Sequence, residues 1–299
     1  MGREVKNKDG LTEKEFLRSY DSDKYKKPSV TVDTLIFTID EKVSKNYRKL
    51  PEKELKILMV KRADHPFIGQ WAIPGGFVDI NECMEEAAER ELFEETGVNN
   101  IYLEQLYTWG DVDRDPRTRV ISTSYMALVD KDTLEIKAGD DASDAKWFSV
   151  KGKVLKEVKT NTINGYIYDK HIILSLKVDD IILTAEVIER IKYENKRSTI
   201  SYCIVEIKGI AFDHAKIIIS ALTRLKNKVE YTDIAFNLMP ELFTLTELQK
   251  VYSILLDRDL LAAQFRRKIN HMVIETNETT KGGGQRPAKL FKFNPHWNE

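Results

Sequence analysis

Two runs of β-branched and aliphatic residues early in the chain predict buried strands, over residues 29–39 and 55–61. Apolar residues then recur at helical spacing, which predicts one amphipathic helix over about 82–95. Gly97 follows that helix at the position where a left-handed residue commonly ends one. Strands with a helix at a loop junction favour the α+β class, with the elements packed as a sandwich.

The same patterns continue to about residue 225. Strands are predicted at 101–107, 119–129 and 145–150, and an amphipathic helix at 212–225. Between them, residues 151–209 contain alternating runs, which we interpret as inserted hairpins. The polar residues 1–28 form a lead-in with one short helix, and 40–54 form a polar loop.

The last seventy residues change character. Three helices are predicted, at 230–243, 246–256 and 262–274, followed by a turn-rich segment and a strand at 288–293. Helices followed by a β-hairpin indicate a winged helix-turn-helix module. The expected domains are therefore a lead-in (1–28), an α+β domain (29–225, with the hairpin insertion at about 151–209) and a winged helix (226–299).

The composition limits the possible classes of protein but does not identify a function. The 299 residues are enough for one or two domains, and 47 basic against 48 acidic residues give a net charge of −1. Any attraction to nucleic acid must therefore be local. Two cysteines, Cys83 and Cys203, form neither a disulfide framework nor a zinc site. The charged N-terminus and short apolar runs predict a cytoplasmic protein without a membrane span.

Three carboxylates lie on one face of the predicted helix. Glu91, Glu94 and Glu95 are spaced i, i+3 and i+4, so their charges repel one another unless a cation is bound. Oxygen ligands suit Mg²⁺ or Mn²⁺. Gly75 and Gly76, just upstream, allow a tight turn close to a ligand. The alternative is a solvated acidic face, which is the usual meaning of such a run.

The spacing of the fixed positions decides between these alternatives. Gly76, Glu82, Arg90-Glu91-Leu92, Glu94-Glu95 and Gly97-Val98 reproduce the complete Nudix signature. Over about residues 30–150 the chain resembles the Nudix (MutT-like) hydrolases, which implies an α/β/α sandwich with a mixed sheet. These enzymes hydrolyse a nucleoside diphosphate linked to another moiety by attack of water on phosphorus.

The resemblance also implies roles for individual residues. Glu91, Glu94 and Glu95 would bind the metal with help from the backbone of Gly75, and Arg90 would orient the glutamates. Glu82 would support the same network. The general base stays open between a helix glutamate and a loop acid, for which the candidates are Asp140, Asp141 and Asp144.

Two segments bear on the substrate, residues 61–77 and 111–119. From the residues alone, Arg114 and Arg117 are candidates to bind a diphosphate, and a charged surface loop is the alternative. PF-x-G-x-WA-x-PGGF together with DRDPR-x-R resembles ADP-ribose pyrophosphatases and related NAD-linked regulators. ADP-ribose or another nucleoside diphosphate sugar is thus the expected substrate. Gly76 would offer a backbone contact, while Phe67 or Trp71 would either stack on the ligand or belong to the core.

Positive charge gathers in the predicted winged helix. Residues 262–293 carry seven basic and two acidic side chains, a net charge of +5. Such charge on a helix and wing suits phosphate-backbone contacts, and a dimer-forming surface is the alternative. The segment over about 229–294 resembles the winged-helix half of NrtR-type regulators, which are dimers that bind operator DNA and sense ADP-ribose or a similar ligand. The DNA-contacting candidates are Gln264, Arg266, Arg267, Lys268 and Arg286.

Three hypotheses follow. The first is a Mg²⁺-dependent hydrolase of ADP-ribose, the second a homodimeric transcriptional regulator that senses such a ligand, and the third a dimer in which the winged helix only serves assembly. Many such regulators have eroded Nudix signatures, whereas this one is intact, which favours hydrolysis. The long segment 151–209 departs from the usual connection between the two halves.

Overall fold

A computed structural model describes residues 5–42, 52–99, 101–133, 142–280 and 287–298. At its centre lies β1 (Ser29–Glu41), which pairs in parallel with β6 (Val120–Leu128) and antiparallel with β2 (Lys53–Arg62). Alternate residues of β1 are buried in different clusters, Leu35 and Phe37 in one and Ile36 in another. Both faces of the strand are therefore covered, which explains why its sequence is apolar almost throughout.

Ten strands of the described ranges form one mixed sheet, in the order β10-β9-β8-β7-β2-β1-β6-β5, with β3 on β2 and β4 on β1. The remaining members of the sheet are β3 (Trp71–Ala72), β4 (Gly75–Phe77), β5 (Tyr102–Trp109), β7 (Ala142–Thr162), β8 (Gly165–Val178), β9 (Ile181–Glu194) and β10 (Arg197–Lys208).

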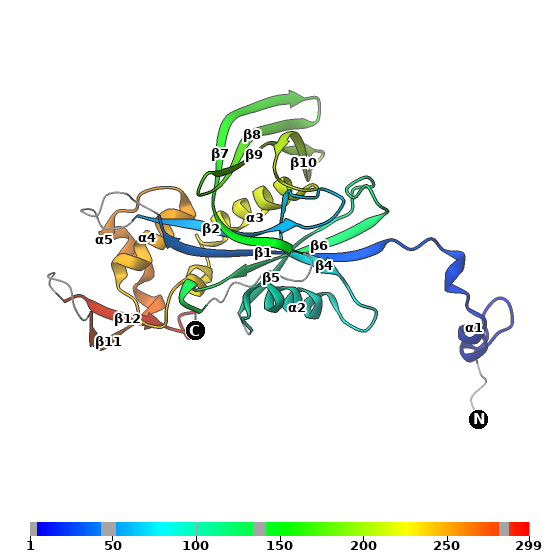
Figure 1. Cartoon of the computed structure of the whole chain (residues 1–299), viewed down its shortest axis with the longest axis horizontal. Coiled ribbons are helices and arrows are strands. Elements are labelled where there is room, and N and C mark those ends of the chain that lie inside the picture. The colour runs from blue at the N-terminus through cyan, green and yellow to red at the C-terminus, as the bar shows by residue number, and fades with distance from the viewer. Residues whose placement is uncertain (1–4, 43–51, 100, 134–141, 281–286, 299) are drawn as a thin grey trace.

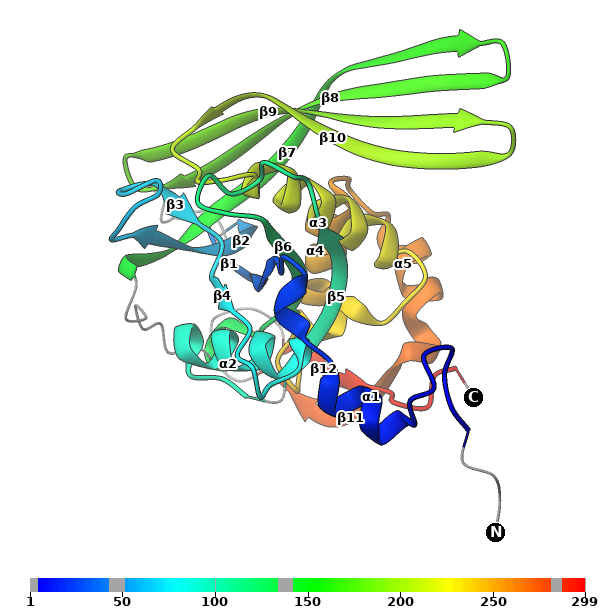
Figure 2. The same cartoon turned by 90° about the vertical axis from the view of Figure 1, so that its right-hand side faces the viewer.

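Two helices lie on opposite sides of the central strands. α2 (Met84–Thr96) lies below β1 in Figure 1, and α3 (His214–Lys228) lies above it, beneath the long strands. Figure 2 shows the same separation from the side. This is the α/β/α arrangement expected from the sequence, and the mixed sheet is confirmed.

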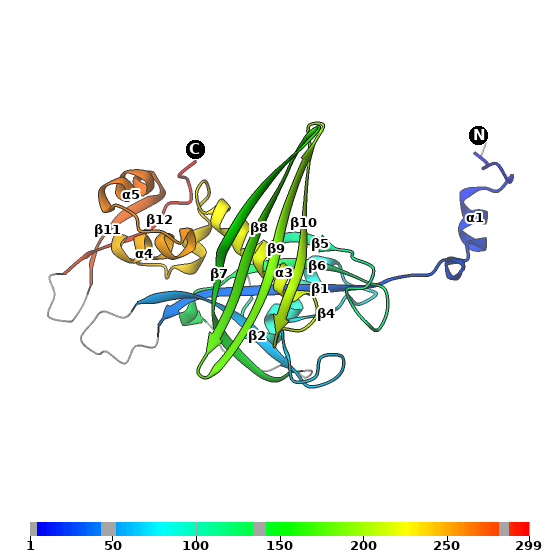
Figure 3. The same ribbon diagram turned by 90° about the horizontal axis from the view of Figure 1, so that it is seen from above.

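Strands β7 to β10 extend the sheet well beyond its centre. They run side by side as long antiparallel hairpins, which Figure 3 shows from above. Their near halves bury Leu174, Leu183 and Val187 in the main apolar core, while most of β10 stays exposed. The predicted hairpins within 151–209 are thus present, and they belong to the central sheet rather than to a separate unit.

The winged helix contains η3 (Ile234–Leu238), α4 (Leu245–Leu256), α5 (Ala262–Ile269), η4 (Asn270–Met272), and the hairpin β11 (Val273–Thr279) with β12 (Lys289–Phe293). The winged-helix prediction is confirmed, with two corrections. The segment 230–243 contains only a 3-10 turn, because Pro240 cannot continue a helix. α5 ends at Ile269 instead of 274, because Val273 and Ile274 pair with β12.

One apolar core joins the sheet, α3 and the winged helix. The same cluster contains Met59 of β2, Ile217 of α3 and Phe243 beside α4. In contrast, the N-terminal segment with α1 (Glu13–Ser19) and η1 (Ser22–Lys24) projects from the body in Figure 1. A further 3-10 turn, η2, spans Lys131–Thr133. No helix in the described ranges is long and apolar enough to cross a bilayer.

Candidate active site

The acidic helix α2 is held on the sheet by its small apolar residues. Ala87 and Ala88 are fully buried against Val32 and Tyr125. The Glu86 carboxylate accepts a hydrogen bond from the backbone N–H of Cys83 at 2.7 Å, which satisfies one donor of the first turn. Gly97 ends the helix with φ of 70°, as the sequence predicted. Glu91 and Glu95 follow Ala87 at i+4 and i+8, so these two carboxylates lie on the covered side of the helix with it.

Arg90 is the centre of an ion-pair network beside these carboxylates. Its guanidinium donates to both carboxylate oxygens of Glu82, at 2.8 and 3.1 Å, and to Glu91 at 2.7 Å. A third carboxylate, Glu94, lies 3.5 Å away. Arg90 also donates to the backbone carbonyl of Phe77 at 3.2 Å, which ties the helix to β4. Arg90 therefore makes the ion pairs that the sequence predicted for it.

The three glutamates differ in their surroundings. Glu91 and Glu95 are buried, whereas the side chain of Glu94 is 51% exposed. Burial raises the pKa of Glu91 above its ordinary value and outweighs the opposing hydrogen bond and charge of Arg90. A cation bound beside the Glu91 carboxylate would stabilise its charged form. In the described part of the chain, no three acidic, His or Cys side chains form a ready-made metal cage.

Each of the two glycines of β4 allows a close approach of the backbone to a different neighbour. A Cβ atom on Gly76 would lie 2.1 Å from Oε1 of Glu91, so only glycine lets the backbone approach that carboxylate so closely. A Cβ atom on Gly75 would instead lie 2.2 Å from the carbonyl oxygen of Val32 in β1. The donors near α2 are thus carboxylates beside an exposed backbone. This set fits a hard divalent cation, which completes its shell with water and substrate phosphates.

Arg114 does not lie where the sequence suggested. Its side chain is only 5% exposed and is clamped by Asp213 at 2.9 Å and Asp33 at 3.4 Å. Ser122 donates a further hydrogen bond to Asp33 at 2.5 Å. A guanidinium that is already neutralised by two buried carboxylates is not presented to a substrate. The structure therefore assigns Arg114 a role in joining β1, its own loop and α3.

The start of α3 supplies residues that the sequence analysis missed. His214 is buried, and its Nδ1 accepts a hydrogen bond from the backbone N–H of Ile73 at 2.9 Å, just before the glycines. Burial lowers the pKa of His214 below its ordinary value. Burial alone would raise the pKa of Asp213, but the hydrogen bonds and charge of Arg114 lower it overall. Asp213-His214 has no spacing signal relative to the Nudix signature, so only the fold reveals this contact.

The remaining substrate candidates divide between surface and core. Arg117 is 43% exposed and pairs with Asp115 at 2.8 Å, and Phe67 is half-buried. Trp71 is 4% exposed and packs its ring 4.8 Å from that of Phe148, so the core alternative holds for it. Asp144 is 44% exposed on β7. Asp140 and Asp141 lie outside the described residues.

The predicted DNA-contacting side chains were also located. Gln264, Arg266 and Arg267 are exposed on α5, while Phe265 turns inward and packs on Tyr252. Lys268 is exposed as well, but its Nζ donates to the carbonyl of Glu230 at 2.8 Å. Arg286 lies outside the described residues. The winged helix therefore presents a short basic helix to solvent.

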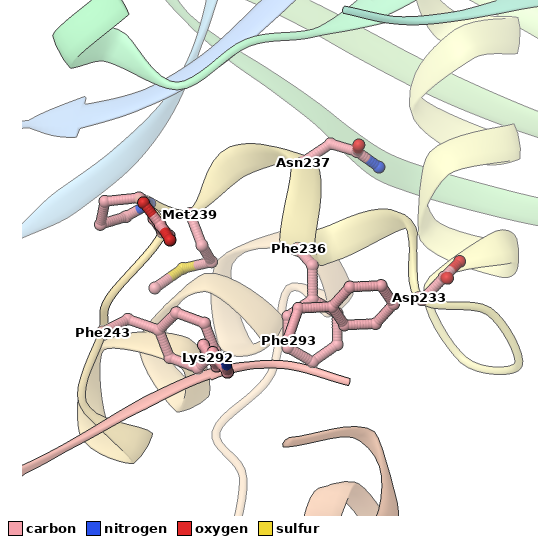
Figure 4. A pocket seen from close by; sticks show the side chains of 9 residues that line it. Asp233, Phe236, Asn237, Met239, Phe243, Lys292 and Phe293 are labelled. Carbon is pink, nitrogen blue, oxygen red and sulfur yellow. The ribbon is translucent and has the colours of Figure 1, made fainter. Parts of the chain in front are cut away.

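Two cavities lie away from α2. One, of about 310 Å³, is in the winged helix, where Phe236, Phe243 and Phe293 line it beside Asp233 and Glu241 (Figure 4). The other, of about 480 Å³, is lined by β5, β10 and α3 and includes Trp109, Tyr202 and Lys216. Neither contains a residue of the Nudix signature. The acidic helix is consequently the best-supported reactive site.

Comparison with known proteins agrees with both halves of the fold. Residues 49–166 match the NUDIX domain family, and residues 235–293 match the NrtR DNA-binding winged helix domain family. Over 285 residues the chain is 30% identical to the ADPR responsive transcriptional repressor NtrR of Acinetobacter baylyi, covering 94% of this chain and 88% of that one. The chain belongs to the NrtR family.

Two further relatives match this NrtR-family chain, one over its Nudix half and the other over most of its length. The ADP-ribose pyrophosphatase of Methanocaldococcus jannaschii is 39% identical over 140 residues, covering 46% of this chain and 73% of that one. The crystal structure of Shewanella oneidensis NrtR complexed with a 27mer DNA is 28% identical, with a TM-score of 0.59, covering 90% of this chain and 94% of that one. Nudix hydrolases generally use a divalent metal, which agrees with the donors found on α2.

Proposed function

We propose that this NrtR-family protein hydrolyses ADP-ribose, or a closely related nucleoside diphosphate sugar, with Mg²⁺ or Mn²⁺. The observation that carries the proposal is the intact network in which Arg90 binds Glu82 and Glu91 beside Gly76. An eroded signature would not keep a buried glutamate and its arginine in this arrangement. The similarity to the ADP-ribose pyrophosphatase of Methanocaldococcus jannaschii supports the choice of substrate.

The residues of the site have distinct tasks in this reaction. Glu91, Glu94 and Glu95 would hold the cation, which would supply polarisation of a phosphoryl oxygen. Arg90 fixes the direction of the Glu91 carboxylate by a charge-assisted hydrogen bond. Arg117, which lies 5.7 Å from the ring of Phe77, is the residue that we propose binds the diphosphate. Water attacks phosphorus and the bond to the bridging oxygen breaks, which yields AMP and ribose 5-phosphate from ADP-ribose.

A turnover panel tests the proposal. Purified full-length protein is incubated with ADP-ribose, NAD(H), sugar nucleotides and dinucleoside polyphosphates, with Mg²⁺, Mn²⁺ or EDTA, and products are separated by chromatography. We expect AMP and ribose 5-phosphate from ADP-ribose with either metal and none with EDTA. Absence of AMP from ADP-ribose under both metals would refute the enzymatic proposal and favour a ligand sensor.

We also propose that the winged helix binds operator DNA and that ADP-ribose or a related ligand controls this binding. Arg266 and Arg267 on α5 are exposed, and their positive charge suits contacts with the phosphate backbone of DNA. The Acinetobacter baylyi relative is an ADPR responsive repressor, and the Shewanella oneidensis relative was crystallised with DNA. We further propose that the protein is cytoplasmic and forms a homodimer. Its domains would divide at about residues 28 and 225.

Arg267→Ala should weaken DNA binding chiefly by removing one phosphate contact. Losing one contact lowers the magnitude of the slope of log affinity against log salt concentration by about 1. It also weakens binding to all DNA sequences alike. Fluorescence anisotropy with the upstream region of the gene, across salt concentrations, measures both effects. Lys153→Ala, an exposed lysine on β7, is the matched control and should leave the slope unchanged. Equal slopes for wild type and Arg267→Ala would contradict the assignment of α5.

A further inference from the structure

Three phenylalanines and two arginines form a cluster beside the Nudix glutamates, which we call the aromatic cluster: Arg62, Phe67, Phe77, Arg117 and Phe212. The rings of Phe67 and Phe212 lie 4.7 Å apart between centroids, at 58°. The guanidinium of Arg62 lies 5.0 Å above the Phe212 ring, and that of Arg117 lies 5.9 Å from it. Rings flanked by guanidinium groups form a surface suited to a planar base next to phosphates.

The aromatic cluster is continuous with the acidic helix. Arg117 also lies 5.7 Å from the ring of Phe77, and the carbonyl of Phe77 accepts a hydrogen bond from Arg90. The cluster is open to solvent as well, because Phe77 is 50% exposed and Phe67 and Phe212 are half-buried. A ligand whose diphosphate lies at α2 therefore has its nucleoside end within reach of these rings.

Both members of the ring pair have unusual backbone conformations. Phe67 has φ of 63° and Phe212 has φ of 52°, values that favour glycine and strain the backbone of a residue with a bulky side chain. Such strain persists where the surrounding structure enforces it, and it gathers at ligand sites. Here the two strained residues, far apart in sequence, place their rings against each other.

Phe212 belongs to the connection that starts α3. Backbone hydrogen bonds from Trp71 to Gly209 at 2.9 Å and from Ala211 to Trp71 at 2.8 Å fasten this connection to the strand that precedes Gly75. The neighbouring Asp213 and His214 anchor it further, through Arg114 and Ile73. α3 then leads into the winged helix and shares its apolar core. A group bound against the Phe212 ring therefore rests on the first residues of the helix that joins the two halves.

We propose that Phe212 is a ligand-recognition residue, which stacks on the base of a bound nucleoside diphosphate and makes the start of α3 part of the ligand site. This inference rests on the proposed function. It adds a specificity-determining residue outside the Nudix signature. Through this residue, a bound ligand contacts the start of α3, the helix that joins the two halves. The partner is a ligand with an aromatic base and a diphosphate, since both parts of the aromatic cluster are then used.

The test compares Phe212→Leu with Phe212→Tyr, which keeps the aromatic face. We expect Phe212→Leu to weaken ADP-ribose binding by about tenfold, measured by calorimetry in EDTA, and to raise KM for hydrolysis by a similar factor with kcat little changed. Phe212→Tyr should restore both values. Phe16→Leu, an exposed phenylalanine on α1 far from α2, is the matched control and should behave as wild type.

Hydrogen exchange of the wild-type protein gives a measurement that needs no variant. ADP-ribose in EDTA should slow amide exchange in peptides that cover residues 209–214. Unchanged affinity and KM in a folded Phe212→Leu protein, or unchanged exchange at 209–214 with ligand bound, would overturn the role of Phe212 alone. Wild-type protein that neither binds nor hydrolyses ADP-ribose would overturn this inference together with the proposed function.

Discussion

Glu94→Gln and Glu95→Gln should each lower the rate of ADP-ribose hydrolysis by at least about a hundredfold. Removing an outer-shell partner of a bound metal commonly costs 10- to 100-fold, and a direct ligand contributes more. Glutamine keeps the size of each side chain but lacks the negative charge that a hard cation prefers. The rate of AMP formation at saturating Mg²⁺ measures the effect, and titration with Mn²⁺ reports the accompanying loss of metal affinity.

Glu89→Gln provides a matched control for these two variants. Glu89 is exposed on the same helix, and its position in the helical repeat places it on the side opposite to Glu91 and Glu95. Its replacement changes the net charge of α2 by the same amount but should leave the hydrolysis rate within about twofold. Full activity in both Glu94→Gln and Glu95→Gln would show that this face of α2 is not the reactive site.

Arg114→Met should destabilise the whole protein rather than weaken substrate binding. The variant leaves Asp33 buried without its guanidinium partner and leaves Asp213 with Lys216, at 3.2 Å, in place of two cations. Breaking a buried pair in this way costs about 3 to 5 kcal/mol. Urea unfolding followed by circular dichroism measures the change in the free energy of unfolding. Methionine retains much of the volume of arginine, so the loss is mainly electrostatic.

Arg258→Met serves as the comparison for this effect. Arg258 pairs with Glu230 at 2.8 Å, but both side chains are more than half exposed. Exposed pairs contribute about 0 to 1 kcal/mol, so this variant should unfold nearly as the wild type does. If Arg114→Met and Arg258→Met lost similar stability, while Arg114→Met raised KM sharply, Arg114 would belong to the substrate site after all.

The acidic helix was predictable because its signature residues lie within one short segment. Fixed spacing from Gly76 to Val98 identifies the glutamates, and local periodicity places them on one face. The supporting residues were not predictable in this way. Asp33 and Asp213 are 180 positions apart in sequence and meet only because α3 packs over β1. For Arg114 the sequence left a diphosphate contact and a charged surface loop open, and the structure instead places its side chain in a buried ion pair.

Some sequence patterns are compatible with two structures. For Trp71 the sequence left ligand stacking and core packing open, and the pairing of its strand turns the side chain into the core. The segment after Ile269 has helical periodicity, but its β-branched residues gain more from pairing in a hairpin. Phe212 gave no signal at all, because its importance lies in a backbone conformation and in a neighbour 145 residues away.

The shared apolar core has a consequence for how the two halves are joined. A module on a flexible tether can be exchanged for another without altering its neighbour. Here Leu225 and Val229 are completely enclosed, and α4 contacts β2 directly. A fragment ending near residue 225 would therefore expose apolar surface to water and lose the stability that packing against the winged helix provides. The boundary expected from the sequence near residue 225 falls inside one shared apolar core, so we expect the two halves to unfold together.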